Sequence, residues 1–272
     1  MRKGLTKQTK SNRMDSLEKS IATSMDCNEN DLVPYLPYIL QDFWEIGSSP
    51  NIILQIIKKL KKNYSILNIL DLGCGKGAVS IKLSSELQCH CLGIDAISGF
   101  IEEAKIKAKQ LDVDSLCTFE INDVRQRIAE LPKSYFDIII LGAIGPVFGN
   151  YYETLSKLKI YLKDNGLIII DDGYIEDTSS YTHPLMIKKQ DLLMQIENAD
   201  MQMIDEVIAD EKDDVSDEHQ IEFENIVKRC TELIQKYPEK KSLFESYIQK
   251  QKEEYDVLEN KVVCTTMVIN RK

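Results

Sequence analysis

Residues 66–77, with the sequence ILNILDLGCGKG, decide the fold. The apolar run over residues 66–70 predicts a buried strand. Gly73, Gly75 and Gly77 follow at alternate positions, so the chain can turn sharply here and its backbone can approach a ligand. A helix predicted directly afterwards supplies free N–H groups and a positive dipole end, which suit a pyrophosphate or a nucleoside joined to an amino acid. By itself the loop is a weak signal, because a plain tight turn between a strand and a helix uses the same residues.

Strands alternate with helices on the C-terminal side of this loop, and several of the strands are continuously apolar. This alternation is typical of a parallel sheet that is covered by helices on both faces. The predicted fold class is therefore α/β, doubly wound and Rossmann-like. The predicted strands are residues 66–70, 90–94, 116–121, 136–141 and 167–170; the predicted helices are residues 51–62, 78–87, 99–111 and 151–162, with a turn at residues 164–166.

The C-terminal third has a different pattern. A helix over residues 191–198 and two strands, residues 201–208 and 262–269, are predicted, and about fifty residues of helical character separate the two strands. The helical pieces are residues 222–237 and 241–258, which Pro238 divides. The expected organisation is a flexible tail (1–15), an N-terminal helical cap (16–63), a ligand-binding core (64–210), a helical insertion (211–260) and the final strand of the core (261–272).

Acidic residues stand at the ends of the next two predicted strands. Asp95 ends the second strand, about 20 residues after the glycine loop, where a carboxylate can accept hydrogen bonds from both hydroxyls of a ribose. Asp123 and Val124 follow the third strand, where a carboxylate can accept from the exocyclic amine of adenine and a backbone N–H can reach a ring nitrogen. Open α/β sheets bind ligands at these carboxyl ends of their strands.

The run DLGCGKG over residues 71–77, with Asp95 and Asp123 behind it, resembles class I methyltransferases that use S-adenosylmethionine (SAM) and release S-adenosylhomocysteine (SAH). The resemblance covers roughly residues 66–172. It implies a seven-stranded sheet with an antiparallel last strand. It also implies that the cofactor-binding residues are Asp71, Gly73, Cys74 and Gly75 near the methionine part, Asp95 and Ala96 at the ribose, Asp123 and Val124 at the adenine, and Leu141 at the end of the fourth strand.

Two other functions remain open at this point. The glycines also satisfy the G-x-G-x-x-G/A pattern of NAD(P)-dependent oxidoreductases, although Asp71 would repel a pyrophosphate and the chain ends in strand, insertion and strand. The second alternative is a SAM- or SAH-binding module without catalysis, which would act by protein interaction through its helical insertion.

The candidate catalytic residues lie beyond the fourth and fifth strands. By analogy, the loop over residues 141–149 faces the transferred methyl group. Asp172, Tyr174 and His183 are candidates for a base or an orienting group, and a solvated strand end is the plain alternative. No metal is expected, because Gly142 and Ala143 do not supply the second acid that catechol-type enzymes place after strand four.

Composition restricts the partners. The formal net charge of −10 disfavours a nucleic-acid substrate, so we expect a small-molecule acceptor that presents an amine or a hydroxyl. Seven scattered cysteines, without an apolar signal sequence or membrane span, indicate a cytoplasmic enzyme with reduced thiols. Residues 205–224 hold ten acids and one lysine, so the insertion is interpreted as a substrate lid or, alternatively, as a homodimer interface.

Overall fold

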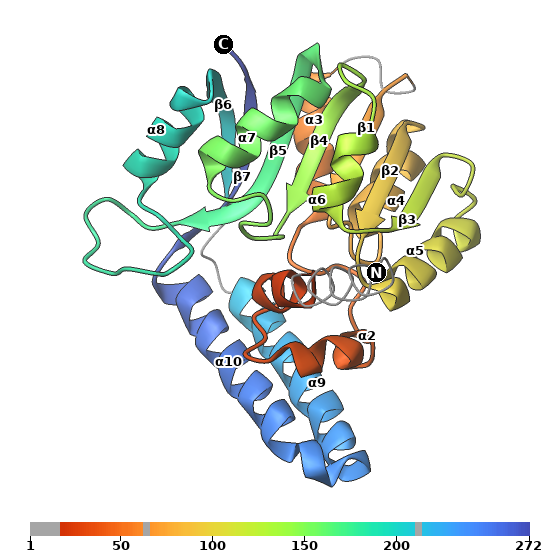
Figure 1. The fold of residues 1–272 in the computed structure, drawn as a ribbon, viewed down its shortest axis with the longest axis vertical. Helices are drawn as coiled ribbons and strands as arrows, with labels where there is room; N and C mark the ends of the chain where they lie inside the picture. Colours follow the sequence, from red (N-terminus) through yellow and green to blue (C-terminus); the bar gives the residue numbers. More distant parts are fainter. Residues whose placement is uncertain (1–16, 62–65, 210–213) are drawn as a thin grey trace, which may run out of the picture. The chain divides into compact units, whose positions relative to one another are not determined.

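The computed structural model describes residues 17–61, 66–209 and 214–272, and the side chains of residues 214–218 lie outside the description. Its centre is a seven-stranded sheet with the order β3-β2-β1-β4-β5-β7-β6 (Figure 1). The strands are parallel except that β7 runs antiparallel to both β5 and β6. This arrangement confirms the predicted fold class, including the antiparallel last strand. The strands are β1 (Asn68–Leu72), β2 (His90–Asp95), β3 (Cys117–Ile121), β4 (Phe136–Gly142), β5 (Leu162–Tyr174), β6 (Met201–Ile208) and β7 (Val263–Arg271).

Helices cover both faces of the sheet, as the apolar runs in the strands require. One face packs against α3 (Pro50–Leu60), α4 (Ala78–Leu87) and α5 (Ser98–Gln110). The other packs against the short α6 (Val124–Arg127), α7 (Tyr151–Leu158) and α8 (Lys189–Asn198) (Figure 1). Short 3-10 segments follow two of these helices, at Ile128–Glu130 and Lys159–Tyr161.

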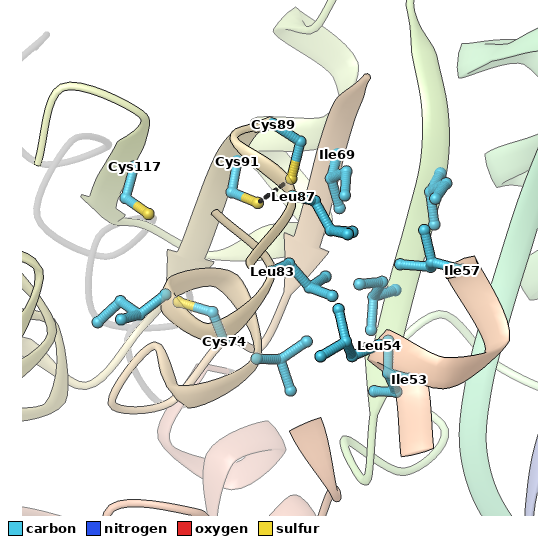
Figure 2. Packing of buried hydrophobic residues seen from close by; sticks show 14 of the residues in the cluster. Ile53, Leu54, Ile57, Ile69, Cys74, Leu83, Leu87, Cys89, Cys91 and Cys117 are labelled. Atoms are coloured by element: carbon cyan, nitrogen blue, oxygen red, sulfur yellow. Dashed lines mark hydrogen bonds between the residues drawn. The ribbon is translucent and has the colours of Figure 1, made fainter. Parts of the chain in front are cut away.

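The core on the α3 side contains a group of thiols. Cys89 and Cys91 lie on the same side of β2, with their sulfur atoms 4.0 Å apart, and Cys117 comes from the neighbouring β3 (Figure 2). His90, which lies between Cys89 and Cys91, is exposed on the opposite face, because side chains alternate along a strand. Cys89, His90 and Cys91 therefore do not converge on one point, and the cysteines serve as small apolar packing groups.

Two local expectations were wrong. The first strand begins at Asn68 rather than Ile66 and extends to Leu72, because Asp71 and Leu72 continue the pairing with β2 and β4. The expected turn at residues 164–166 lies inside β5, where the register shifts: Phe136 pairs with Leu162 but Ile138 pairs with Leu167. The extra residues form an irregularity of the strand and do not precede it.

The described residues divide into two compact units, and the sheet with its six covering helices forms the larger one (43–61, 66–209 and 258–272). The predicted N-terminal cap is divided between the units, because the apolar stripe of α3 packs on the sheet.

The smaller unit (17–42 and 214–257) is helical, and residues 17–24 form its first helix. Tyr35 packs edge-on against both Tyr237 and Phe244, and Arg229 forms an ion pair with Asp42. No helix within the described ranges is long and apolar enough to cross a membrane. The other elements of the smaller unit are a 3-10 segment (Asn30–Tyr35), α2 (Leu36–Ile39), α9 (Asp214–Lys236), a second 3-10 segment (Pro238–Lys240) and α10 (Lys241–Asn260). The last residues of α10 cluster with the larger unit.

Candidate functional site

The glycine loop connects β1 to α4 and adopts the backbone that its sequence predicts. Gly73, Gly75 and Gly77 all have positive φ angles, of 71°, 52° and 74°. The N–H groups of Gly73 and Cys74 both donate to the carbonyl of Ile94 on β2, at 2.8 and 3.2 Å. At Gly75 an added Cβ would meet nothing within 4 Å. The loop backbone is thus tied to the end of β2 and open to its surroundings at the middle glycine, which fits a ligand that approaches the backbone closely.

Asp95 joins this loop to the next helix. Its Oδ2 accepts the N–H of Gly75 at 3.0 Å, and its Oδ1 accepts the N–H of Ile97 at 2.8 Å. Burial raises the pKa of Asp95, while the N–H groups of Ile97, Gly75 and, least, Ala96 act against the rise. A carboxylate has about four acceptor positions, so these two hydrogen bonds leave roughly two for a ligand. That capacity fits the two hydroxyls of a ribose.

Asp71 is buried beneath the loop, at 2% exposure. Its Oδ2 accepts a hydrogen bond of 2.6 Å from the hydroxyl of Ser80, the third residue of α4. Burial raises the pKa of Asp71 to about 6; the Ser80 hydroxyl opposes the rise and the charge of Asp95 adds to it. A buried carboxyl of this kind gains stability from a nearby cation, and a SAM molecule has a cationic sulfonium and a cationic amino group.

The remaining polar groups of the loop are occupied within the fold. The thiol of Cys74 is buried in the core on the α3 side, so only the backbone of this residue faces the loop. Lys76, 2% exposed, pairs with Glu103 on α5 at 2.8 Å. The indole N–H of Trp44 donates to the carbonyl of Lys76 at 3.3 Å, a contact that the sequence did not reveal.

Asp123 lies at the end of β3, where it caps α6, and its carboxylate accepts four hydrogen bonds. Oδ1 accepts the backbone N–H and the Nε–H of Arg125, both at 2.9 Å. Oδ2 accepts from Nη2 of Arg125 at 2.8 Å and from Nε2 of Gln126 at 3.1 Å. Burial would raise the pKa of Asp123, but the bonds from Arg125 and Gln126 hold it below its ordinary value. The adjacent Val124 is buried and begins α6.

The loop after β4 packs directly on the glycine loop. Leu141 is buried at its start, and an added Cβ at Gly73 would lie 2.3 Å from Cγ2 of Ile144. Gly145 has a φ of 63° and, like Gly75, opens onto space that no atom fills within 4 Å of an added Cβ. The loop after β4 thus packs against the glycine loop through the side chain of Ile144.

Asp172, a predicted catalytic residue, is hydrogen-bonded to a residue that the sequence did not indicate. Its Oδ2 accepts the hydroxyl of Tyr151, at 2.8 Å, from the first residue of α7, and its Oδ1 accepts the N–H of Gly173. Burial raises the pKa of both Asp172 and Tyr151, and the charge of Asp172 adds to the rise at the phenol. The two groups form a half-buried acid–phenol pair at the carboxyl end of β5.

Tyr174 shares this face of the sheet but is bonded elsewhere. Its ring is 1% exposed, and its hydroxyl accepts from Nζ of Lys189, which also pairs with Glu206; both distances are 2.9 Å. Burial raises the pKa of Tyr174, and Lys189 opposes the rise. The hydroxyl is thereby directed toward α8 and β6.

His183 lies in the connection between β5 and α8. Its Nδ1 accepts the N–H groups of Leu185 and Met186, at 3.2 and 3.1 Å. An imidazole that accepts at Nδ1 has its proton on Nε2, so this loop arrangement leaves no basic lone pair on the outer nitrogen. A role as base would require these two bonds to break.

Asp171, next to Asp172 but on the α3 face, is a second half-buried acid that sequence reasoning missed. It pairs in register with Gly142 and with Thr266. Burial raises its pKa to about 6, while the hydroxyl of Ser48 and the backbone N–H of Ser49 act against the rise. The Ser48 hydroxyl is nonetheless buried without a hydrogen bond of normal geometry.

The comparisons with known proteins agree on one family. The model of the family described as "Methyltransferase domain" matches residues 60–261. The ubiquinone biosynthesis O-methyltransferase of Rickettsia akari is 32% identical over 120 residues, which cover 42% of this chain and 45% of that protein. The demethylmenaquinone methyltransferase of Leptospira interrogans is 26% identical over 125 residues, 45% of this chain and 50% of the relative. The matches thus span half or less of these relatives.

Among solved structures, a SAM-dependent methyltransferase from Geobacter sulfurreducens, crystallised with SAH, has a TM-score of 0.71 at 17% identity; the likeness covers 86% of this chain and 96% of that one. The resemblance to class I SAM-dependent methyltransferases is confirmed, and with it the predicted enzyme class and cofactor. The family match also removes the nicotinamide alternative. The chain belongs to the methyltransferase-domain family.

Proposed function

We propose that this protein transfers the methyl group of SAM to a small-molecule acceptor and releases SAH. The observation that carries the proposal is the junction of the glycine loop with Asp95. One hydrogen bond joins Gly75 to Asp95, Gly75 opens onto free space, and the carboxylate keeps acceptor capacity for two hydroxyls. A nucleoside joined to an amino acid fits this combination of a ribose acceptor and an exposed loop backbone.

We assign each part of the cofactor to residues at the carboxyl end of one strand. We assign the methionine part to the loop backbone of Gly73, Cys74 and Gly75 above the buried Asp71, and the ribose to Asp95 beside Ala96. Adenine is assigned to Asp123 and Val124, and Leu141 lines the donor side at the end of β4. When bound, SAM supplies an electrophilic methyl group, and the protein has to position the acceptor in line with it and exclude water.

The acceptor is proposed to lie beyond β4 and β5. A hydroxyl acceptor is protonated at neutral pH and needs a base, whereas a neutral amine does not. Asp172 is the candidate base that the geometry supports best, because it lies at the carboxyl end of β5 and its carboxylate keeps acceptor positions beside those taken by Tyr151 and Gly173; burial also raises its pKa. Tyr174 and His183 remain weaker candidates, since Lys189 and the loop N–H groups already engage their polar atoms.

The name of the Rickettsia relative specifies transfer to oxygen, which favours a hydroxyl over an amine acceptor. The acidic segment over residues 205–224 favours a cationic acceptor instead, and residues 210–213 of this segment lie outside the described part of the chain. A cytoplasmic location, the absence of a nucleic-acid partner and a homodimer stay expectations of the sequence.

Calorimetry and turnover test the proposal together. We expect SAH to bind and NADH not to bind, and we expect conversion of SAM to SAH when a pool of phenols and amines is added. Binding of SAH without any turnover would favour the module without catalysis, and absence of SAH binding would end the proposal.

A further inference from the structure

The carboxylate of Asp123 has no acceptor position left for a nucleoside. Four donors share its two oxygens at 2.8 to 3.1 Å, and a carboxylate offers about four such positions. Asp95, the corresponding acid at the end of β2, accepts only two hydrogen bonds of normal geometry. The two carboxylates therefore differ in their free acceptor positions: Asp95 can accept further hydrogen bonds from a ligand, whereas Asp123 must first lose one of its donors.

Three of the four donors on Asp123 are held firmly. The backbone N–H of Arg125 belongs to the cap of α6 and cannot leave without unwinding that turn. The guanidinium of Arg125 makes two charge-assisted bonds to the two oxygens, which are stronger than neutral ones and fixed in direction.

The fourth donor differs from the other three in the strength with which it is held. The side-chain amide of Gln126 is neutral, its bond of 3.1 Å is the longest of the four, and the residue is exposed. Its donor is a planar NH₂ group on a trigonal carbon, which is also the chemical form of the 6-amino group of adenine. Gln126 thus presents to Oδ2 the kind of group that the nucleoside would present.

We propose that Gln126 occupies the adenine position of Asp123 in the free protein and yields Oδ2 to the 6-amino group when the cofactor binds. This inference rests on the proposed function, since it requires adenine at the end of β3. The hydrogen bonds from Arg125 to Asp123 stay in place when the cofactor binds, so the carboxylate of Asp123 remains charged and oriented. Only a ligand that brings a replacement donor can displace Gln126 without loss, and a 6-keto purine would set its carbonyl against the carboxylate.

The test compares two ligands by calorimetry on the full chain: SAH and S-inosylhomocysteine, in which a 6-keto group replaces the 6-amino group and the ring atom N1 carries a hydrogen. The variants are Gln126→Met, which keeps the length of the side chain without a donor, and Gln126→Ala. Gln110→Ala, an exposed glutamine at the end of α5, is the matched control. We expect both Gln126 variants to bind SAH about two- to tenfold more tightly than the wild type, the value of one neutral hydrogen bond.

For S-inosylhomocysteine we expect no tightening, because its 6-keto oxygen cannot donate to the position that Gln126 has left. Unchanged or weaker SAH binding in both Gln126 variants, with normal binding by the wild type, would overturn the inference and leave the proposed function standing. Equal tightening for both ligands would also overturn it, because the gain would not involve the 6-amino group. If the wild type binds no SAH, the proposed function fails first and the inference falls with it.

Discussion

Asp95 is the residue on which the assignment of the ribose depends. Replacing it by Ala removes two predicted hydrogen bonds to the ribose, so SAH affinity should fall by about 1–3 kcal/mol, or roughly 5- to 150-fold. Glu102→Ala, which removes an exposed acid on the neighbouring α5, is the control for the change in net charge. Calorimetry measures both; equal affinity in the Asp95 variant and the wild type would mean that the ribose lies elsewhere.

Asp71 should make the free energy of unfolding depend on pH. Its pKa is raised to about 6 in the folded protein from an ordinary value near 3.8, so between these values the folded state holds a proton that the unfolded state has lost. The stability associated with this proton is present below about pH 4 and is lost as the pH rises through 6, by about 3 kcal/mol at most.

The variant Asp71→Asn isolates this effect, because other acids contribute equally to both proteins. Urea unfolding at pH 4.5 and pH 7.5 should show the variant gaining stability relative to the wild type as the pH rises. Parallel pH dependence of the two proteins would contradict a raised pKa at Asp71.

At the scale of elements, the order of strands and helices could be predicted from the sequence, whereas the bounds of β1 and β5 and the side-chain pairs between elements could not. The apolar runs placed the end of β2 within one residue, so Asp95 could be located there, whereas β1 and β5 end two and four residues later than expected. Tyr151 lies 21 residues from Asp172 in the sequence, and only the packing of α7 on β5 brings them together. Asp171 and Asp172 look alike in the sequence, but alternation along the strand places them on opposite faces with different partners.

The contact between the β4 end and the segment before α3 is a second feature of packing that has a measurable consequence. An added Cβ at Gly142 would lie 2.3 Å from the Ser48 hydroxyl oxygen, and Gly142 has an ordinary backbone without positive φ. We therefore expect Gly142→Ala to destabilise the protein by about 1–3 kcal/mol through overpacking alone.

A double-mutant cycle tests whether contact with Ser48 causes the stability lost in Gly142→Ala. Ser48→Gly in the same chain should recover most of the stability lost by Gly142→Ala, as measured by thermal unfolding. Gly145→Ala is the contrasting variant, because its φ of 63° causes strain while an added Cβ there meets no atom; Ser48→Gly should not rescue it. Additive effects of the first pair would show that Ser48 is not the obstacle.

At the scale of the whole molecule, the two units allow cofactor binding and acceptor binding to be separated. All nine residues assigned to the cofactor lie in the larger unit, which contains the complete sheet. The helical segment between β6 and β7 leaves this unit at one place: Ile208 pairs with Thr265, and the N–H of Ala209 donates to the carbonyl of Cys264 at 3.0 Å. The ends of the segment are therefore close enough for a short hairpin loop to replace it.

A chain of residues 43–272 in which a four-residue loop of Asn and Gly replaces residues 210–261 should consequently fold and bind SAH within about twofold of the full chain, because no cofactor contact is removed. If the helical unit shapes the acceptor site, the same chain should lose turnover on an acceptor that the full chain methylates. Calorimetry and a SAH-release assay separate the two readouts, and circular dichroism with a cooperative thermal transition verifies folding. A folded variant that binds SAH and keeps full turnover would exclude a lid role for the helices. A homodimer interface would then be their remaining role, and sedimentation of both chains would test it.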